Sequence, residues 1–179
     1  MRFVQTPLSG AWAIEPERLG DERGWFARTF DAEEFERRGL NHVVAQCNAS
    51  FNARRGTLRG MHYQAEPHGE SKLVRCVRGS IFDVAIDLRS GSETYRSWHG
   101  VELSAENGHA YYIPAGFAHG FQTLADDCEV LYLMGHRYVP EAARGVRWDD
   151  PAFGIRWPSV EDERVISERD RSYADFRAG

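Results

Sequence analysis

The stretch Gly108–His119, GHAYYIPAGFAH, decides the fold of this chain. The apolar run Ala110–Ile113 is typical of a buried strand, and Pro114 and Gly116 favour a sharp turn. We predict a strand, a tight turn and a second strand that carries His119 to the mouth of a β-barrel.

Further short strands are expected around this stretch. Lys72–Arg78 and Ser80–Leu88 are joined by a tight turn at Arg78–Gly79, and Asp83 lies on the face of its strand opposite Phe82. The other candidate strands are Trp98–Leu103, Ala110–Ile113, Phe121–Leu124 and Glu129–Met134. Short strands separated by Gly, Pro and Asp turns predict an antiparallel sandwich or barrel, and residues 1–179 are expected to form one domain.

Two segments with a different pattern flank these strands. In Asp31–Gly39, DAEEFERRG, Asp31 can cap a short helix and Gly39 can end it. The charged segment Pro158–Phe176 is expected to form loop and a short helix.

The composition excludes several classes of protein. Hydrophobic residues make up 42% of the chain and the net charge is −5, which fits a packed globular protein and disfavours non-specific nucleic-acid binding. Cys47, Cys76 and Cys128 are widely spaced, so neither a disulfide framework nor a zinc site is implied, and buried thiols are expected for the last two. Because no signal-like or membrane-spanning apolar run is present, we predict a cytoplasmic protein without a membrane partner.

A histidine and the only lysine of the chain lie together in the segment Gly56–Lys72, GTLRGMHYQAEPHGESK. Lysine provides a compact positive charge with three donors, and burial can lower its pKa. Beside His62, Lys72 suggests a site that removes a proton and then stabilises the resulting anion.

Both segments resemble the sequence signatures of cupins. The second signature, G-x5-P-x-G-x2-H, is matched at Gly108, Pro114, Gly116 and His119. The first, G-x5-H-x-H, is matched only at Gly56 and His62, and Glu70 is offset from the usual position. A metal-binding cupin needs two histidines on one face of a strand, and Gln64 occupies the second position. His62 and His119 are therefore expected to handle protons or to form hydrogen bonds, without a metal.

The whole chain resembles the dTDP-4-dehydrorhamnose 3,5-epimerases, which are metal-free, cupin-type sugar-nucleotide epimerases. The matching stretches, in chain order, are DERGWF, QCNASFN, GTLRGMHYQ, KLVRCVRGSIFDVAIDLR, VELSAENG, IPAGFAHGF, RGVRWDDPAFGIRWP and ISERD. The resemblance implies a mainly β, cupin-like double-stranded β-helix (a jelly-roll barrel) with a few short helices. It also implies a cofactor-free homodimer of rhamnose and deoxysugar biosynthesis, in which the N-terminal strand crosses to the partner subunit.

The substrate implied by this resemblance is a nucleotide-linked 4-keto-6-deoxyhexose, with dTDP as the nucleotide. Its C–H bonds at C3 and C5 are α to the C4 ketone, so each epimerisation needs a base, an acid on the opposite face and donors at the C4 oxygen. By resemblance, His62 is the base and Asp170 its carboxylate partner. Tyr132 is then the proton donor, and Lys72 lies near the enolate oxygen. The positions implied to contact the substrate or to line the cavity are Arg23, Gln46, Asn48, Arg59, Asp83, His119, Tyr138 and Arg169.

Each of these residues also has a purely structural interpretation. A single histidine on a strand, such as His62, is more often structural than catalytic. Asp170 fits a helix capping box with Ser167, and Tyr132 fits a core position with its hydroxyl at the edge. Arg59 and His62 have opposite strand parity, so both reach one cavity only if a bulge or bend intervenes.

Several departures from the family pattern bear on the identity of the substrate more than on the type of reaction. Arg28 and Ala143 stand where the family often has glutamate, Arg169 replaces a common lysine, and LMGHR differs from the usual run between two tyrosines. Three rival functions stay open: an enzyme that epimerises one carbon or moves the keto group between C3 and C4, a non-catalytic sugar-binding cupin, and a metal-dependent oxygenase.

Overall fold

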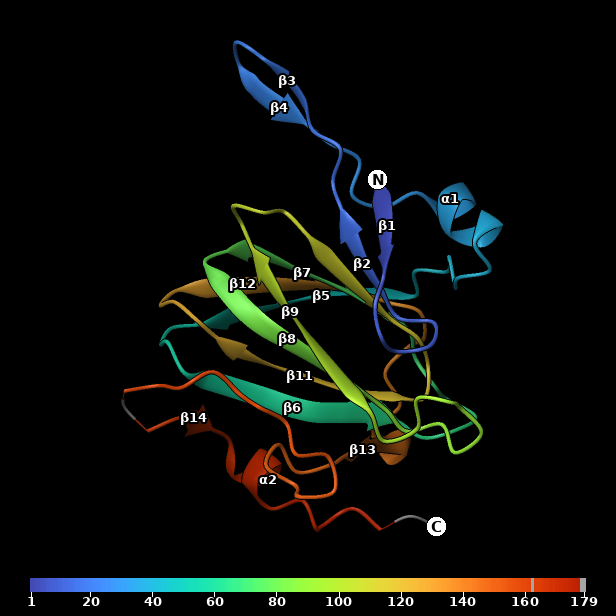
Figure 1. Cartoon of the computed structure of the whole chain (residues 1–179), viewed down its shortest axis with the longest axis vertical. Coiled ribbons are helices and arrows are strands. Elements are labelled where there is room, and N and C mark those ends of the chain that lie inside the picture. Colours follow the sequence, from blue (N-terminus) through green and yellow to red (C-terminus); the bar gives the residue numbers. More distant parts are fainter. Residues whose placement is uncertain (162, 178–179) are drawn as a thin grey trace.

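Two β-sheets packed face to face make up most of the computed structural model (Figure 1). The first sheet contains, in order, β1 (Arg2–Gln5), β2 (Trp12–Glu15), β10 (Ala110–Ile113), β7 (Lys72–Arg78), β12 (Cys128–Met134) and β5 (Gln46–Asn52). The second contains β13 (Ala143–Gly145), β6 (Thr57–Gln64), β11 (Phe117–Thr123), β8 (Ser80–Asp87) and β9 (Trp98–Ser104), and β14 (Val165–Ile166) pairs with β6. All pairs are antiparallel except β14 with β6.

This arrangement confirms the predicted mainly β, jelly-roll architecture. The structure describes residues 1–161 and 163–177, and the expected domain of residues 1–179 also includes positions 162, 178 and 179, which lie outside the described residues. The strands predicted at Lys72–Arg78 and Ala110–Ile113 have the expected bounds. By contrast, β11 begins at Phe117, earlier than predicted, directly after the turn at Pro114–Gly116.

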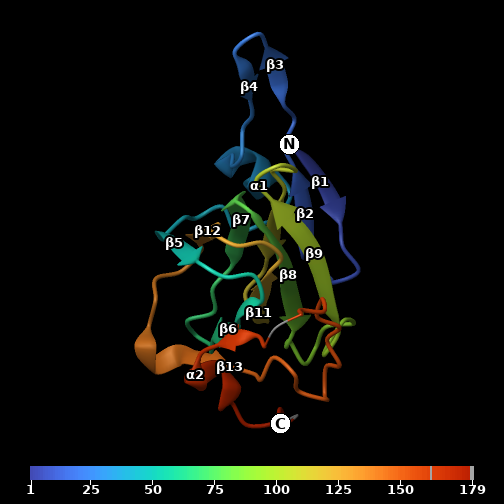
Figure 2. The ribbon, with the colours of Figure 1, turned by 90° about the vertical axis from the view of Figure 1, so that its left-hand side faces the viewer.

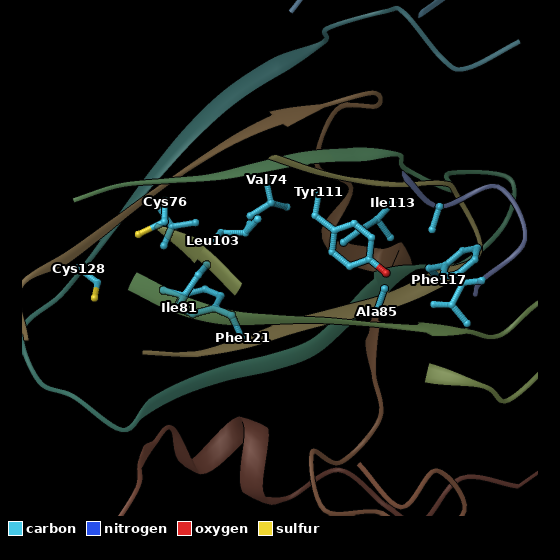
Figure 3. Packing of buried hydrophobic residues seen from close by; sticks show 13 residues of the cluster. Val74, Cys76, Ile81, Ala85, Leu103, Tyr111, Ile113, Phe117, Phe121 and Cys128 are labelled. Carbon is cyan, nitrogen blue, oxygen red and sulfur yellow. The ribbon is translucent and has the colours of Figure 1, made fainter. Parts of the chain in front are cut away.

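The inward faces of the strands divide into an apolar part and a polar part. Figure 3 shows the apolar part, where Val74 and Tyr111 of the first sheet pack with Ile81 and Phe121 of the second. The predicted buried thiols, Cys76 and Cys128, belong to this core, and burial raises the pKa of Cys76 to about 12. Further along the same inward faces, β7 continues to Lys72 and β12 to Tyr132 and Met134. The candidate site therefore lies at one end of the space between the sheets.

The turn at Arg78–Gly79 crosses from one sheet to the other. Its two strands do not pair with each other: β7 pairs with β10 and β12, whereas β8 pairs with β11 and β9. Gly79 has a φ of 74°, and a Cβ at this position would lie 2.6 Å from the Sγ atom of Cys128. The crossover therefore favours glycine.

Both faces of β8 are buried. On the outer face, Phe82 and Val84 pack against Phe153 and Trp157 from the C-terminal part of the chain. On the inner face, Asp83 has no exposed surface. Of the two environments that the alternating pattern allows for Asp83, solvent or a polar interior, the structure has the interior one.

The remaining elements lie outside the barrel. The predicted N-terminal helix is α1 (Ala32–Arg37), where Asp31 accepts a hydrogen bond from the Glu34 N–H at 3.2 Å and Gly39 follows with a φ of 68°. The predicted C-terminal helix is α2 (Glu168–Arg171), and a 3₁₀ turn, η1 (Pro140–Ala142), precedes β13. Strands β3 (Leu19–Asp21) and β4 (Gly24–Phe26) form a hairpin that projects away from the barrel in both views (Figures 1 and 2).

Within the described residues, no helix has the length and apolar character to span a membrane.

Candidate active site

A cavity of about 230 Å³ lies between the two sheets at the end where β7 begins and β12 ends. Residues from both sheets line it: Asn48, Arg59, His62, Glu70, Lys72, His119, Tyr132 and Met134. Six of the residues predicted as catalytic or substrate-binding from the sequence are therefore brought together: Asn48, Arg59, His62, Lys72, His119 and Tyr132.

His62 and Asp170 form a hydrogen-bonded dyad at this cavity. The Nε2 atom of His62 lies 2.7 Å from Oδ1 of Asp170, and the Gly60 N–H donates to the other carboxylate oxygen at 3.1 Å. Burial raises the pKa of Asp170, but hydrogen bonds from His62, Gly60 and Ser167 outweigh it, so the pKa lies below its ordinary value. Because an ionised carboxylate can only accept, Nε2 carries a proton and Nδ1 remains the basic nitrogen.

Asp170 also lies in the capping box that the sequence suggests. Its N–H donates to the Oγ atom of Ser167 at 3.2 Å at the start of α2, which lies beneath β6 in Figure 1. The backbone of Asp170 thus begins the helix while its side chain holds His62. The structure therefore contains both the predicted capping box and the predicted contact with His62.

A bulge in β6 brings Arg59 and His62 to the same cavity. The register pairs His119 with His62 and Phe121 with Arg59, so two steps along β11 correspond to three along β6. The extra residue lies at Gly60, which has a φ of 134°, and a Cβ there would come within 2.5 Å of the β11 backbone. The bulge that the strand parity required is therefore present.

His119 and Asp83 form a second imidazole–carboxylate pair next to the first. The Nε2 atom of His119 lies 2.7 Å from Oδ1 of Asp83, and His119 is directly opposite His62 in the β11–β6 register. Burial raises the pKa of Asp83, and the neighbouring His119 opposes that rise. The Oδ2 atom of Asp83 has no hydrogen-bond partner among the described residues.

Tyr132 lies on the other sheet, across the cavity from His62. Its hydroxyl is 2.9 Å from the Oγ atom of Ser50 on the neighbouring strand β5. Burial raises the pKa of the Tyr132 phenol, so it is protonated at neutral pH. A protonated phenol therefore stands on one side of the cavity and a basic imidazole on the other.

Lys72 lies between these groups and is buried. Its ammonium donates to the carbonyl oxygen of His62 at 3.1 Å and forms an ion pair with Glu70 at 3.2 Å. Burial lowers the pKa of Lys72, and the nearby carboxylates of Glu70 and Asp83 oppose that fall.

Gln64, which replaces the second histidine of the cupin signature, is held by backbone groups. Its amide nitrogen donates to the carbonyl oxygens of His68 and Arg137 at 3.0 and 3.1 Å, and its oxygen accepts from the Val139 N–H at 2.6 Å. In the part of the chain that the structure describes, no three His, Cys, Asp or Glu side chains are grouped as metal ligands.

Four predicted substrate contacts lie away from the central cavity, and a fifth predicted residue, Asp83, does not line it but contacts the lining residue His119. Gln46 accepts a hydrogen bond from the N–H of the exposed Tyr138 at 2.6 Å, beyond the cavity. Arg169 lines a neighbouring hollow that also contains His62 and Asp170, and its Nε atom donates to Tyr173 at 3.1 Å. Arg23 lies in the projecting hairpin, where it pairs with Asp21.

The two positions with a lost glutamate also lie away from the cavity. Arg28 is exposed and pairs with Asp31 at 2.9 Å, and Ala143 is in β13 beside Gln64. Neither contributes to the lining of the central cavity.

Two polar residues at the site, and the lining residue Met134, were not predicted from the sequence. Ser50 contacts the Tyr132 hydroxyl, and Glu70 pairs with Lys72. Ser50 belongs to the QCNASFN stretch, but only the pairing of β5 with β12 shows what it contacts. Glu70 was considered only as an offset metal ligand of the cupin signature.

The chain is similar to known proteins over nearly its whole length. The family model described as dTDP-4-dehydrorhamnose 3,5-epimerase matches residues 5–178. The dTDP-4-dehydrorhamnose 3,5-epimerase of Methanothermobacter thermautotrophicus is 50% identical over 98% of this chain and 95% of its own length.

Solved structures show the same fold. The crystal structure of dTDP-4-dehydrorhamnose 3,5-epimerase from Elizabethkingia anophelis has a TM-score of 0.95 at 40% identity and covers 98% of this chain and 96% of its own. ChmJ, a 3'-monoepimerase from Streptomyces bikiniensis in complex with dTDP-quinovose, has a TM-score of 0.86 at 38% identity, with coverages of 95% and 85%. The chain therefore belongs to the dTDP-4-dehydrorhamnose 3,5-epimerase family of isomerases.

Proposed function

We propose that this protein epimerises C3 and C5 of a dTDP-linked 4-keto-6-deoxyhexose through an enolate at C4, without a cofactor. The observation that carries the proposal is the position of His62 and Tyr132 on different sheets, on two sides of one cavity. Inversion of a carbon centre requires a base on one face and an acid on the other, and this pair supplies both.

In the proposed reaction, Nδ1 of His62 removes the proton from C3 or C5. The electron pair of the broken C–H bond forms a double bond to C4, and the carbonyl electrons move to the C4 oxygen. Lys72 donates a hydrogen bond to this enolate oxygen. Tyr132 then gives its proton to the opposite face of the carbon, and the C4 carbonyl forms again. His62 releases the proton that it took to solvent, and solvent returns a proton to the Tyr132 phenolate.

The remaining polar groups of the cavity suit a charged nucleotide sugar. Arg59 carries a guanidinium at the cavity, and such a group pairs well with diphosphate. The bound dTDP-quinovose of ChmJ supports a dTDP-linked ligand for this chain. Because Arg28 and Ala143 lie outside the cavity, we expect the departures from the family to affect recognition of the nucleotide rather than proton transfer.

We further propose that the protein works as a homodimer through exchange of its N-terminal hairpin. The hairpin projects from the barrel (Figures 1 and 2). Its residues Leu19 and Phe26 are 72% and 67% exposed. On the outer face of the first sheet, Phe51 and Leu131 are also exposed, at 51% and 40%. In such a dimer, the hairpin of one subunit would cover the exposed apolar groups on the first sheet of its partner. Arg23 of that hairpin would then lie near the partner's cavity. A cytoplasmic location stays a prediction.

Proton exchange with solvent tests the reaction. The purified protein is incubated in D2O with a dTDP-linked 4-keto-6-deoxyhexose, and deuterium is located by NMR. Label at both C3 and C5, with inversion, supports the proposal, whereas label at one carbon supports the narrower epimerase that the likeness to ChmJ keeps as an alternative. If neither C3 nor C5 exchanges its proton, the result would favour a sugar-binding protein without catalytic activity.

A further inference from the structure

The ammonium of Lys72 has a carboxylate partner for which the reaction alone gives no reason. Glu70 lies 3.2 Å from the Lys72 Nζ atom, and the two side chains are only 9% and 7% exposed. A second donor of the ammonium goes to the His62 carbonyl oxygen at 3.1 Å. An ammonium has three donors, so one remains for a ligand in the cavity that Lys72, Glu70 and His62 line together.

A lysine in this position faces a conflict between burial and charge. The proposed reaction favours the ammonium form, because a charged donor forms a hydrogen bond to an oxyanion that is about twice as strong as that of a neutral donor. Burial favours the neutral amine and lowers the pKa of Lys72. A nearby negative charge therefore favours the form of Lys72 that keeps the proton on nitrogen.

The groups around Lys72 show which negative charge is available. The titratable and charged groups that face it from the surrounding elements are Glu70 from its own segment, Asp83 of β8, Arg59 and His62 of β6, His119 of β11 and Tyr132 of β12. The carboxylate of Asp83 is already hydrogen-bonded to His119, at 2.7 Å. The guanidinium of Arg59 adds positive charge to the same cavity. Glu70 is the carboxylate in direct contact with the ammonium.

We infer that Glu70 is a positioning residue of this site, whose carboxylate keeps Lys72 in its ammonium form and directs its third donor into the cavity. Glu70 acts through Lys72 and takes no proton from the sugar. The inference rests on the proposed function for its role in the reaction, but the state of Lys72 can be measured without any substrate.

The single lysine of the chain makes this measurement direct. Protein labelled with ¹³C-lysine gives one Cε resonance, so the titration of Lys72 can be followed by NMR without assignment. An opposite charge within about 4–6 Å shifts a pKa by about one to three pH units. In Glu70→Gln, we therefore expect the titration midpoint of Lys72 to fall by about one to three pH units. Glu66→Gln, which changes an exposed carboxylate in the same loop, is the matched control and should titrate like the wild type.

A midpoint in Glu70→Gln equal to that of the wild type would overturn the inference. If Glu70→Gln does not fold, Glu70→Asp replaces it. Its shorter side chain withdraws the carboxylate from Nζ, so the midpoint should fall by a smaller amount, and an unchanged midpoint would again overturn the inference.

The pH profile of turnover links Lys72 to the reaction. Since Lys72 must be charged, its loss of a proton limits kcat/KM at high pH. Because the pH profile of kcat/KM reports the free enzyme, the alkaline limb of the Glu70→Gln profile should move to lower pH by the same amount as the NMR midpoint. A purely structural role for Glu70 would lower kcat/KM equally at every pH. If the wild type shows no turnover at all, the proposed function fails, while the NMR titration still decides the role of Glu70.

Discussion

His62 and Tyr132 line the same cavity from different sheets, His62 on β6 and Tyr132 on β12. Neither strand pairs with the other, so the two side chains approach the cavity from separate layers of the barrel. Asp170 fixes the imidazole, and Ser50 contacts the phenol. The fold therefore places an imidazole and a phenol on two sides of one cavity.

Asp170→Asn should lower turnover by a factor on the order of 10²–10⁴ with the fold intact. Asparagine keeps the shape of the side chain, but it no longer provides the negative charge that holds the His62 tautomer and stabilises the imidazolium. The measurement is kcat together with the melting temperature. Asp175→Asn changes an exposed aspartate of the same C-terminal segment and serves as the control. A kcat for Asp170→Asn equal to that of the control would remove the dyad from the mechanism.

Lys72→Met should be nearly as damaging, because loss of one donor to a developing oxyanion costs about 2.7–4 kcal/mol of transition-state stabilisation. The substitution also leaves Glu70 buried without its partner, which lowers the free energy of unfolding. In the double variant Lys72→Met with Glu70→Gln, we expect stability to recover and turnover to stay low. Recovery of both would mean that Lys72 only maintains the structure.

Ser50→Ala should lower kcat by about tenfold, the order expected for loss of one hydrogen bond of about 1–1.5 kcal/mol. Ser50 lies 2.9 Å from the Tyr132 oxygen and can donate to the phenolate that forms when Tyr132 gives up its proton. In a Tyr132→Phe background, the same substitution should have no further effect. Equal losses of kcat in both backgrounds would show that Ser50 acts elsewhere.

Mixtures of two inactive variants test the hairpin exchange. If Arg23 serves the partner's site, a dimer of one Arg23→Ala and one His62→Ala subunit has one intact site. Random exchange should then restore up to about a quarter of wild-type activity, since half of the dimers are mixed. Mixing His62→Ala with Asp170→Asn is the control, because those two residues belong to one subunit's site and no intact site can form. Equal activity in the two mixtures would exclude the exchange.

Much of the fold follows from local sequence patterns. The strands β7 and β10 have their predicted bounds because apolar residues and turn residues mark both ends. The partners of the strands depend on long-range contacts that no local pattern specifies. The turn at Gly79 looks like an ordinary hairpin turn in the sequence, although it crosses between sheets. Asp83 lies in the interior because its face of β8 packs against the first sheet, while a distant C-terminal segment buries the apolar opposite face.

The site, like the fold, could be predicted only in part, because local sequence patterns do not show long-range contacts. His62, Lys72, Tyr132 and Asp170 were named by family resemblance, and the structure places them together. Ser50 and Glu70 were missed, since their importance lies in contacts of 2.9 and 3.2 Å with those residues. The bulge at Gly60 could be inferred only as a condition for Arg59 and His62 to share a cavity.

Solvent deuterium exchange in two variants tests the central claim most directly, because it separates proton removal from proton return. With a dTDP-linked 4-keto-6-deoxyhexose in D2O, His62→Ala should show almost no deuterium at C3 or C5. Tyr132→Phe should still incorporate deuterium through His62, with loss of inversion at a carbon that depends on the phenol. Deuterium uptake by His62→Ala at the wild-type rate, or full inversion by Tyr132→Phe, would contradict the assignment of His62 as the base and Tyr132 as the acid.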